Sequence, residues 1–244
     1  MGLLEVPVFT VEAALEAFRC GAHRLELCSD FSEGGTTPSA GLLQFLKSKI
    51  SIPIFVMIRP RGGDFIYTEE ELEVMEQDIS ILGASGADGF VFGILDENGM
   101  VDRKANERLL KLAENKPCTF HRAFDLTPNL KESLNKIQEL GFDRILTSGG
   151  KATVSDGWDI ILELVEFAQN RIIIMPGGGS HPRHARELQS LGLLKEIHAS
   201  CKSLRSSSSV FKKEGMNFSL DMERFHQVLT INPILLSEFL AAME

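Results

Sequence analysis

Two arginines and an aspartate lie close together in the segment Ile52–Tyr67, which begins as an apolar strand and ends in charged residues. Residues two apart on a strand point the same way, so Arg59 and Arg61 are expected to present both guanidinium groups on one face. Two glycines allow a sharp turn after them, which brings Asp64 within reach of either arginine. Because the planar guanidinium group suits carboxylate and phosphate, the segment predicts a binding site for a small anion. A surface Arg–Asp salt bridge is the structural alternative.

Glu26 is the strongest candidate for a working carboxylate. It lies in the middle of a predicted strand, between Leu25 and Leu27, where an unpaired acid would be costly to bury. Two interpretations stay open: a buried ion pair with Arg59 that only organises the interior, and a catalytic role.

Two histidines, His121 and His198, also stand at predicted strand ends. A lone histidine on an apolar strand is more often a core residue than a ligand, but other polar strand ends nearby favour function. The alternation of a strand would place His121 and Arg122 on opposite faces, so we expect only one of them to point inward.

Glycine-rich turns follow two later strands. Ser148 precedes a glycine pair, and Gly177, Gly178 and Gly179 stand directly before a predicted helix. In many α/β barrels, backbone N–H groups at such a turn bind phosphate. A tight turn is the equally simple explanation.

Soft metal ligands are few. Cys28, Met57 and His121 could all face the same interior, and thiolate, thioether and imidazole would suit Cu(I). Their spacing matches no ligand motif, and a buried cysteine with a gap-filling methionine is the commoner outcome.

Charge and cysteine usage exclude several classes of protein. Acidic residues outnumber basic ones 34 to 25, giving a formal net charge of −9, whereas nucleic acids and anionic membranes are bound by basic faces. No segment is long and apolar enough to span a membrane. The four cysteines form no C-x-x-C pair, which argues against a disulfide framework or structural zinc and indicates a reducing, intracellular compartment.

Short apolar runs alternate with amphipathic segments of helical length along the chain, which predicts eight strand–helix units and a single (β/α)8 barrel domain over residues 1–244. A doubly wound open sheet is the alternative, but no G-x-G-x-x-G follows the first strand. The expected strands are Leu3–Val8, Arg24–Cys28, Ile52–Arg59, Gly89–Leu95, Cys118–Phe124, Arg144–Ser148, Arg171–Met175 and Glu196–Ser200.

Residues typical of helix ends support the helices that are predicted between these strands. Thr68 and Glu71 predict a capping box, and Gly141 predicts a helix end. The polar segment Arg205–Phe218 is expected to be an excursion after the eighth strand. The tail from Asp221 to Met243 is expected to form a closing helix, with Pro233 as an interruption.

Six sequence blocks resemble the CutC family, long labelled copper-homeostasis proteins, and the resemblance runs from residue 3 to about 204. The blocks are Arg24–Cys28, Glu33–Ser39, Ile58–Phe65, Thr119–Asp125, Leu146–Gly149 and Met175–Gly179. The resemblance implies a (β/α)8 barrel, a cytoplasmic or also nuclear setting, self-association as a dimer or tetramer, and Cu(I) binding as the attributed activity.

Two function classes follow. One is a copper-handling protein that holds Cu(I) through Cys28, with help from Met57 or His121. The other is an enzyme or binding protein for a small anionic metabolite, in which Arg59 and Arg61 hold the anion and Glu26 with His121 forms an acid–base pair. Residue chemistry favours the anion, and the resemblance favours copper.

Overall fold

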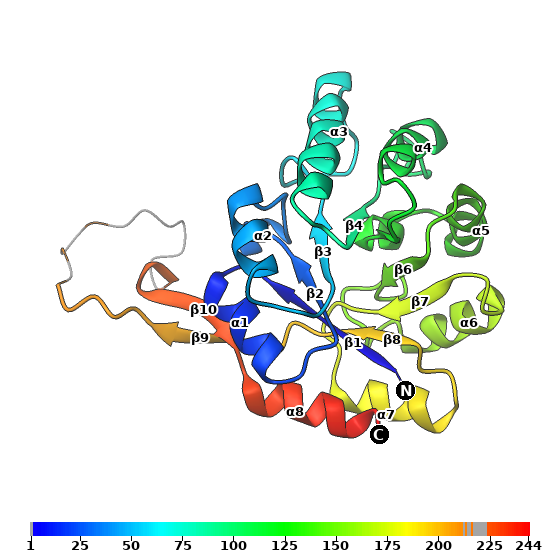
Figure 1. The fold of residues 1–244 in the computed structure, drawn as a ribbon. Helices are drawn as coiled ribbons and strands as arrows, with labels where there is room; N and C mark the ends of the chain where they lie inside the picture. The colour runs from blue at the N-terminus through cyan, green and yellow to red at the C-terminus, as the bar shows by residue number, and fades with distance from the viewer. Residues whose placement is uncertain (1, 212, 214–215, 217–223) are drawn as a thin grey trace.

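Eight parallel strands form a nearly closed barrel in the computed structural model, which describes residues 2–211, 213, 216 and 224–244 (Figure 1). Neighbours pair in the order β7-β6-β5-β4-β3-β2-β1-β8, and the two end strands of this order contact each other. The strands are β1 (Leu3–Val8), β2 (Arg24–Leu27), β3 (Ile54–Met57), β4 (Gly89–Phe92), β5 (Cys118–Phe120), β6 (Arg144–Thr147), β7 (Ile173–Pro176) and β8 (Glu196–His198). The predicted (β/α)8 barrel is confirmed, with most strands shorter than expected.

Helices surround the ring of strands on its outside. The α-helices are α1 (Val11–Arg19), α2 (Ala40–Lys47), α3 (Glu69–Ala84), α4 (Arg103–Leu112), α5 (Leu130–Leu140), α6 (Trp158–Ala168), α7 (Pro182–Ser190) and α8 (Pro233–Ala242). The capping box of Thr68 and Glu71 opens α3, and Gly141 ends α5 in the left-handed conformation, both as predicted. Within the described residues, no helix has the length and apolar character needed to cross a membrane.

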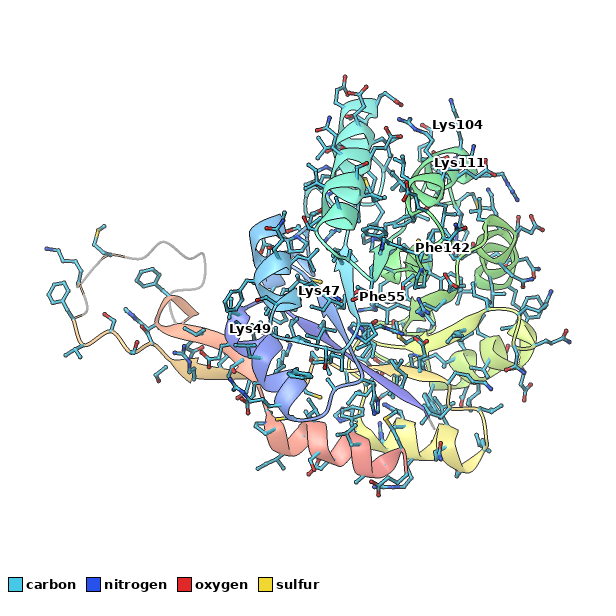
Figure 2. All side chains as sticks on the ribbon, in the orientation of Figure 1. Lys47, Lys49, Phe55, Lys104, Lys111 and Phe142 are labelled. Carbon is cyan, nitrogen blue, oxygen red and sulfur yellow. The ribbon has the colours of Figure 1, made fainter. Side chains whose placement is uncertain are left out.

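The apolar core lies mainly between the strands and the helices. Phe142, for example, packs edge-on against Phe120 with ring centroids 5.2 Å apart. A smaller cluster, which includes Phe55, lies apart from this core. Figure 2 shows Phe55 near the middle of the strands, while Lys104 and Lys111 project outward from α4.

A layer of buried charges crosses the barrel at Arg24. Its guanidinium group donates from Nε to Glu5 at 2.5 Å and from Nη2 to Glu196. Arg144 donates to the same Glu196 oxygen at 3.0 Å. The ring of Phe55 lies against both arginines, 4.5 and 5.0 Å from their guanidinium carbons. These five residues are called the charge layer below.

The C-terminal segment differs from the prediction in two ways. The first two residues of the expected polar excursion, Arg205 and Ser206, belong to β9 (Lys202–Ser206), and β10 (Gln227–Ile231) replaces part of the expected closing helix. These two strands pair antiparallel and project from the barrel beside α1 (Figure 1). Pro233 does not interrupt the closing helix but occupies its first turn, where a proline loses no helical hydrogen bond. The predicted start of that helix at Asp221 falls within residues 217–223, outside the described residues.

Candidate active site

A cavity of about 870 Å³ lies at the carboxyl ends of the strands, where barrel enzymes carry their active sites. Aromatic and aliphatic side chains form part of its wall, and ionisable ones converge on it. The ionisable residues that line it are Glu26, Glu33, Arg59, His121, Arg122, Asp125, Lys151, His198, Cys201 and Lys202.

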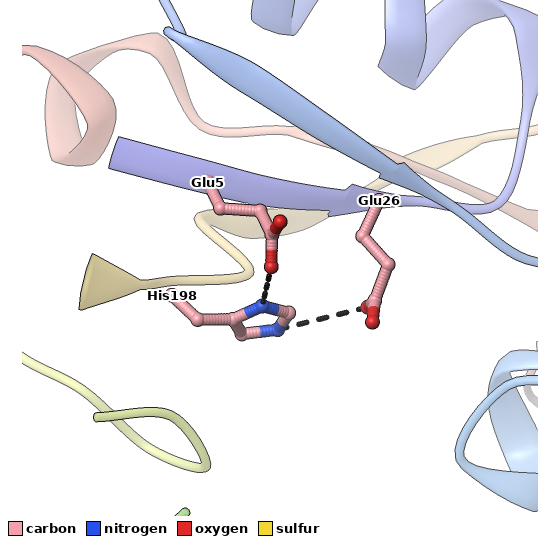
Figure 3. Close-up of side chains that lie close together, drawn as sticks. All are labelled: Glu5, Glu26 and His198. Atoms are coloured by element: carbon pink, nitrogen blue, oxygen red, sulfur yellow. Dashed lines mark hydrogen bonds and ion pairs between the residues drawn. The ribbon is translucent and has the colours of Figure 1, made fainter. Parts of the chain in front are cut away.

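His198 lies between two glutamates, Glu5 and Glu26 (Figure 3), and both His198 and Glu26 line this cavity. Its Nδ1 is 2.9 Å from Glu5 Oε1, and its Nε2 is 3.9 Å from Glu26 Oε2. The strand register explains the meeting, because Glu5 on β1 is the lateral partner of both Arg24 on β2 and His198 on β8. We call Glu5, His198 and Glu26 the carboxylate–imidazole array.

The two glutamates of the array have opposite proton affinities. Burial opposes the ionisation of Glu5, but the charges of Arg24 and His198 outweigh it and lower its pKa to about 2. For Glu26, burial and the nearby Glu5 charge prevail over the attraction of His198 and raise its pKa to about 7. Burial opposes protonation of His198, yet Glu26 and Glu5 raise its pKa above the ordinary value. A group that titrates near pH 7 can both accept and donate a proton at physiological pH.

The ion pair considered above between Glu26 and Arg59 is not found. No hydrogen bond or ion pair joins it to Arg59 among the described residues, and its Oε1 has no nitrogen or oxygen partner there. The Arg59 guanidinium group instead donates to three backbone carbonyls, those of Glu33, Gly35 and Gly63. Arg59 therefore connects the two loops that follow β2 and β3, and it lines the cavity without an ion pair to any described carboxylate.

Arg61 does not share the orientation of Arg59. The strand ends at Met57, so the two-residue alternation does not extend to the arginines. Arg61 donates to Glu71 at 2.5 Å and to Asp64 at 3.1 Å, and neither Arg61 nor Asp64 is among the residues that line the cavity. The salt-bridge alternative therefore describes Arg61.

His121 and Arg122 both line the cavity, contrary to the expected opposition of their side chains. Strand β5 ends at Phe120, and a 3₁₀ turn (Arg122–Leu126) follows, so strand alternation no longer applies. Burial and the Arg59 charge lower the pKa of His121 to about 3, so its imidazole is neutral at physiological pH. It is thus unsuited to the role of general base that was expected of it.

Asp125 organises the next part of the rim. Its carboxylate accepts from Arg122 Nε at 2.9 Å and from the backbone N–H groups of Ser148 and Gly150. Ser148 is fully buried, and its hydroxyl lies 2.6 Å from Arg122 Nη2. Ser148 is not among the residues that line the cavity, so this predicted ligand residue supports Arg122 instead.

The three glycines after β7 have different roles: two of them line the cavity, and one allows close packing. Gly178 and Gly179 line the cavity in left-handed backbone conformations, whereas Gly177 does not line it. A Cβ atom on Gly177 would lie 2.3 Å from Leu146 and 3.0 Å from the Cβ of His198. Gly177 therefore allows the close packing behind His198.

The predicted Cu(I) donors are only partly assembled. A Cβ atom on Gly35 would lie 3.3 Å from Cys28 Sγ and 3.5 Å from Met57 Cε, so these two side chains flank the same glycine. His121 instead packs on Phe65, with ring centroids 4.7 Å apart. Burial and the Glu26 charge raise the pKa of the Cys28 thiol well above its ordinary value, which opposes the thiolate that copper requires.

Harder metal ligands meet in the array itself. Among the described histidines, cysteines and acidic residues, ligand atoms of Glu5, Glu26 and His198 lie within 4.8 Å of one another. Carboxylates suit harder ions than Cu(I), and both Glu5 oxygens already have partners in Arg24 and His198. These residues therefore do not fit a Cu(I) centre.

Comparisons with known proteins agree with the sequence blocks. The model of the CutC family matches residues 2–203. The chain belongs to the CutC family. A human relative named copper homeostasis protein cutC homolog is 43% identical over 241 residues, covering 95% of this chain and 88% of its own. A CutC family protein from Histophilus somni is 42% identical, covering 84% of each chain. The crystal structure of a Streptococcus agalactiae CutC has a TM-score of 0.77 and 35% identity, and covers 82% of this chain and 99% of its own.

Four residues in or near the cavity of this CutC-family chain had too weak a signal in the sequence to be predicted as site residues. Glu5 carries the same signal as Glu26, an acid within an apolar strand, but its link to His198 depends on β1 lying beside β8. Arg122 was expected to lie on the face opposite to His121, because strand alternation was extended beyond the end of β5. Lys151 and Lys202 carry no local signal: the first reaches the cavity from the loop after β6, and the second from the start of β9.

The raised pKa of Glu26 predicts how stability changes with pH. Between its ordinary value of 4.5 and about 7, only the folded state holds this proton, so the free energy of unfolding falls as pH rises through that window. We expect Glu26→Gln to remove this contribution, on the order of 3 kcal/mol between pH 4.5 and pH 8. Urea denaturation of both proteins across this range measures it. The exposed Glu139→Gln is the control, and parallel curves for wild type and Glu26→Gln would contradict the assignment.

Proposed function

We propose that this protein is an enzyme that transfers a proton to or from a small anionic metabolite, with Glu26 and His198 as the acid–base pair. The observation that carries this proposal is the carboxylate–imidazole array, of which His198 and Glu26 line the cavity. Glu26, with a pKa near 7, stands beside an imidazole whose own pKa is raised. Strongly shifted groups that share a cleft are typical of sites that perform proton transfer.

Arg59 supports the anionic character of the ligand. It is only 4% exposed, and its hydrogen bonds go to neutral carbonyl oxygens, with no carboxylate partner among the described residues. A buried charge without a counter-ion is costly, and an anionic ligand would supply one. Arg122, Lys151 and Lys202 add positive charge to the same cavity, against an overall charge of −9.

The cavity also has the size of a metabolite site. Its volume of about 870 Å³ lies within the range of about 300–1,000 Å³ that is usual for pockets of small ligands. Its wall combines apolar side chains, such as Phe31, Leu146 and Phe239, with the convergent charges described above. This composition orients a small polar molecule and restricts its contact with water.

Copper binding is the second candidate function, because relatives of this chain are named copper homeostasis proteins. The proximity of Cys28 and Met57 at Gly35 favours it. The thiol must first lose its proton, so binding at this site would strengthen as pH rises. Self-association and a cytoplasmic or nuclear setting, which the family resemblance implies, stay predictions.

Proton exchange tests the first proposal. The protein is incubated in D₂O with a panel of small carboxylates and phosphate esters, and NMR follows the loss of their C–H signals. We expect exchange in at least one compound, slowed about 10²–10⁴-fold in Glu26→Gln because the acid–base group is removed. Glu139→Gln, an exposed residue on α5, is the control. Exchange that is equally fast in Glu26→Gln would contradict the assignment of the base.

A Cu(I) titration tests the second candidate. Under anaerobic conditions and against a competing chelator, Cys28→Ser should lose one equivalent of bound Cu(I) relative to wild type, and wild-type affinity should increase from pH 6 to pH 8. Cys20→Ser, at the end of α1, is the matched control. The same stoichiometry and affinity in Cys28→Ser would exclude Cys28 as a ligand.

A further inference from the structure

We propose that His121 binds the carbonyl oxygen of the substrate as a neutral N–H donor, and that the reaction is removal of a proton from the carbon next to that carbonyl. This inference deepens the proposed function and rests on it. It limits the substrate to small anionic compounds that carry a carbonyl group beside a C–H bond, such as 2-oxo acids.

The tautomer of His121 follows from its local hydrogen bond. The backbone N–H of Ala123 donates to His121 Nδ1 at 3.3 Å, so Nδ1 carries a lone pair and the ring hydrogen is on Nε2. The ring is neutral at physiological pH because burial and the Arg59 charge both oppose its protonation. His121 is therefore a hydrogen-bond donor at Nε2 and a poor base.

The Nε2 donor has no hydrogen-bond partner in the part of the chain that the structure describes. His121 is 4% exposed, and its Nε2 atom is buried without a hydrogen bond among the described residues. Phe65 and Phe120 pack on the imidazole, with ring centroids 4.7 and 6.2 Å away, so the ring is held in place. A buried donor without a partner is unfavourable, and a ligand oxygen in the cavity would satisfy it.

Arg59 adds a fixed positive charge near His121, while His121 remains the group that we propose binds the carbonyl oxygen. Its guanidinium carbon lies 4.9 Å from the centroid of the same Phe65 ring that contacts His121. Its charge is close enough to affect the imidazole, and no described carboxylate neutralises it. Negative charge that develops on an oxygen at His121 would therefore be stabilised by a fixed positive charge nearby.

Glu26 completes the chemistry from the same cavity. Its Oε1 also lacks a nitrogen or oxygen partner among the residues that the structure describes. As a carboxylate, it takes the proton from the carbon beside the carbonyl: the C–H bond breaks and an O–H bond forms on Glu26. The electron pair of the C–H bond becomes part of an enolate, and the resulting charge rests on the oxygen that His121 holds. A neutral imidazole suits this role because it stabilises the oxyanion without protonating it too early.

Oxalate is the probe, since it is a planar dianion that resembles the enolate of a 2-oxo acid. We expect calorimetry to show binding to wild type and about 10–100-fold weaker binding to His121→Phe, which retains the ring packing but not the donor. His121→Gln, which restores an N–H donor, should recover part of the affinity. In ¹⁵N-histidine NMR, oxalate should shift the Nε2–H resonance of His121. His184, whose Nε2 faces Ser155 outside the cavity, is the internal control.

The outcomes separate this inference from the proposed function. Equal affinity in His121→Phe, an unmoved His121 resonance, or no oxalate binding to wild type would overturn the role of His121. Proton exchange that depends on Glu26 would still stand in those cases, because it is measured without oxalate. If instead oxalate moves the His121 resonance but no compound exchanges protons, the oxygen site stands and the proton-transfer function fails.

Discussion

The ion pair between Arg24 and Glu5 is the interaction on which the site depends. Both side chains are buried inside the barrel, where neither charge could remain without the other. Glu196 and Arg144 extend the pair into the charge layer, and Phe55 lies against both arginines. The layer keeps Glu5 ionised, and an ionised Glu5 holds His198 by its Nδ1.

Because of this ion pair, two glutamates on adjacent strands differ in their pKa. Glu5 has an arginine beside it and stays charged, while Glu26 forms no ion pair with an arginine among the described residues and has a pKa raised to about 7. Two side chains of the same type thus differ in proton affinity because of their surroundings, as in many acid–base sites. His198 and His121 also differ in pKa because of their surroundings. His198 is flanked by acids, and His121 is flanked by an arginine and aromatic rings.

Much of the fold and part of the site could be predicted from the sequence. The eight strands were identified because apolar runs bounded by glycine and polar residues are a local signal, and Glu26 was identified because a charge within such a run needs an explanation. The predictions that were wrong concerned the orientation of residues that lie past the ends of the strands. Arg61 turned outward because β3 ends before it, and Arg122 turned inward because the chain enters a 3₁₀ turn after β5.

Other features lay beyond local patterns altogether. The partnership of Glu5 with His198 joins residues 193 positions apart, and it exists only because the barrel places β8 beside β1. Strand β9 is polar and largely exposed, so it lacks the apolar run that reveals a strand, and β10 lies in the segment where a closing helix was expected. The role of Pro233, by contrast, had a local signal that was missed, because Asn232 directly before it is a preferred N-cap residue and proline suits the first turn of a helix.

The most direct test of this account is the titration of the Glu26 carboxyl group itself. In protein labelled with ¹³C at the glutamate side-chain carboxyl, NMR would follow each signal from pH 3 to pH 9, with Glu26→Gln and Glu5→Gln used to assign the two resonances. The account predicts that Glu26 titrates near pH 7 and that Glu5 remains ionised to the acid limit of the experiment. A Glu26 signal that titrates at its ordinary value of 4.5 would contradict it.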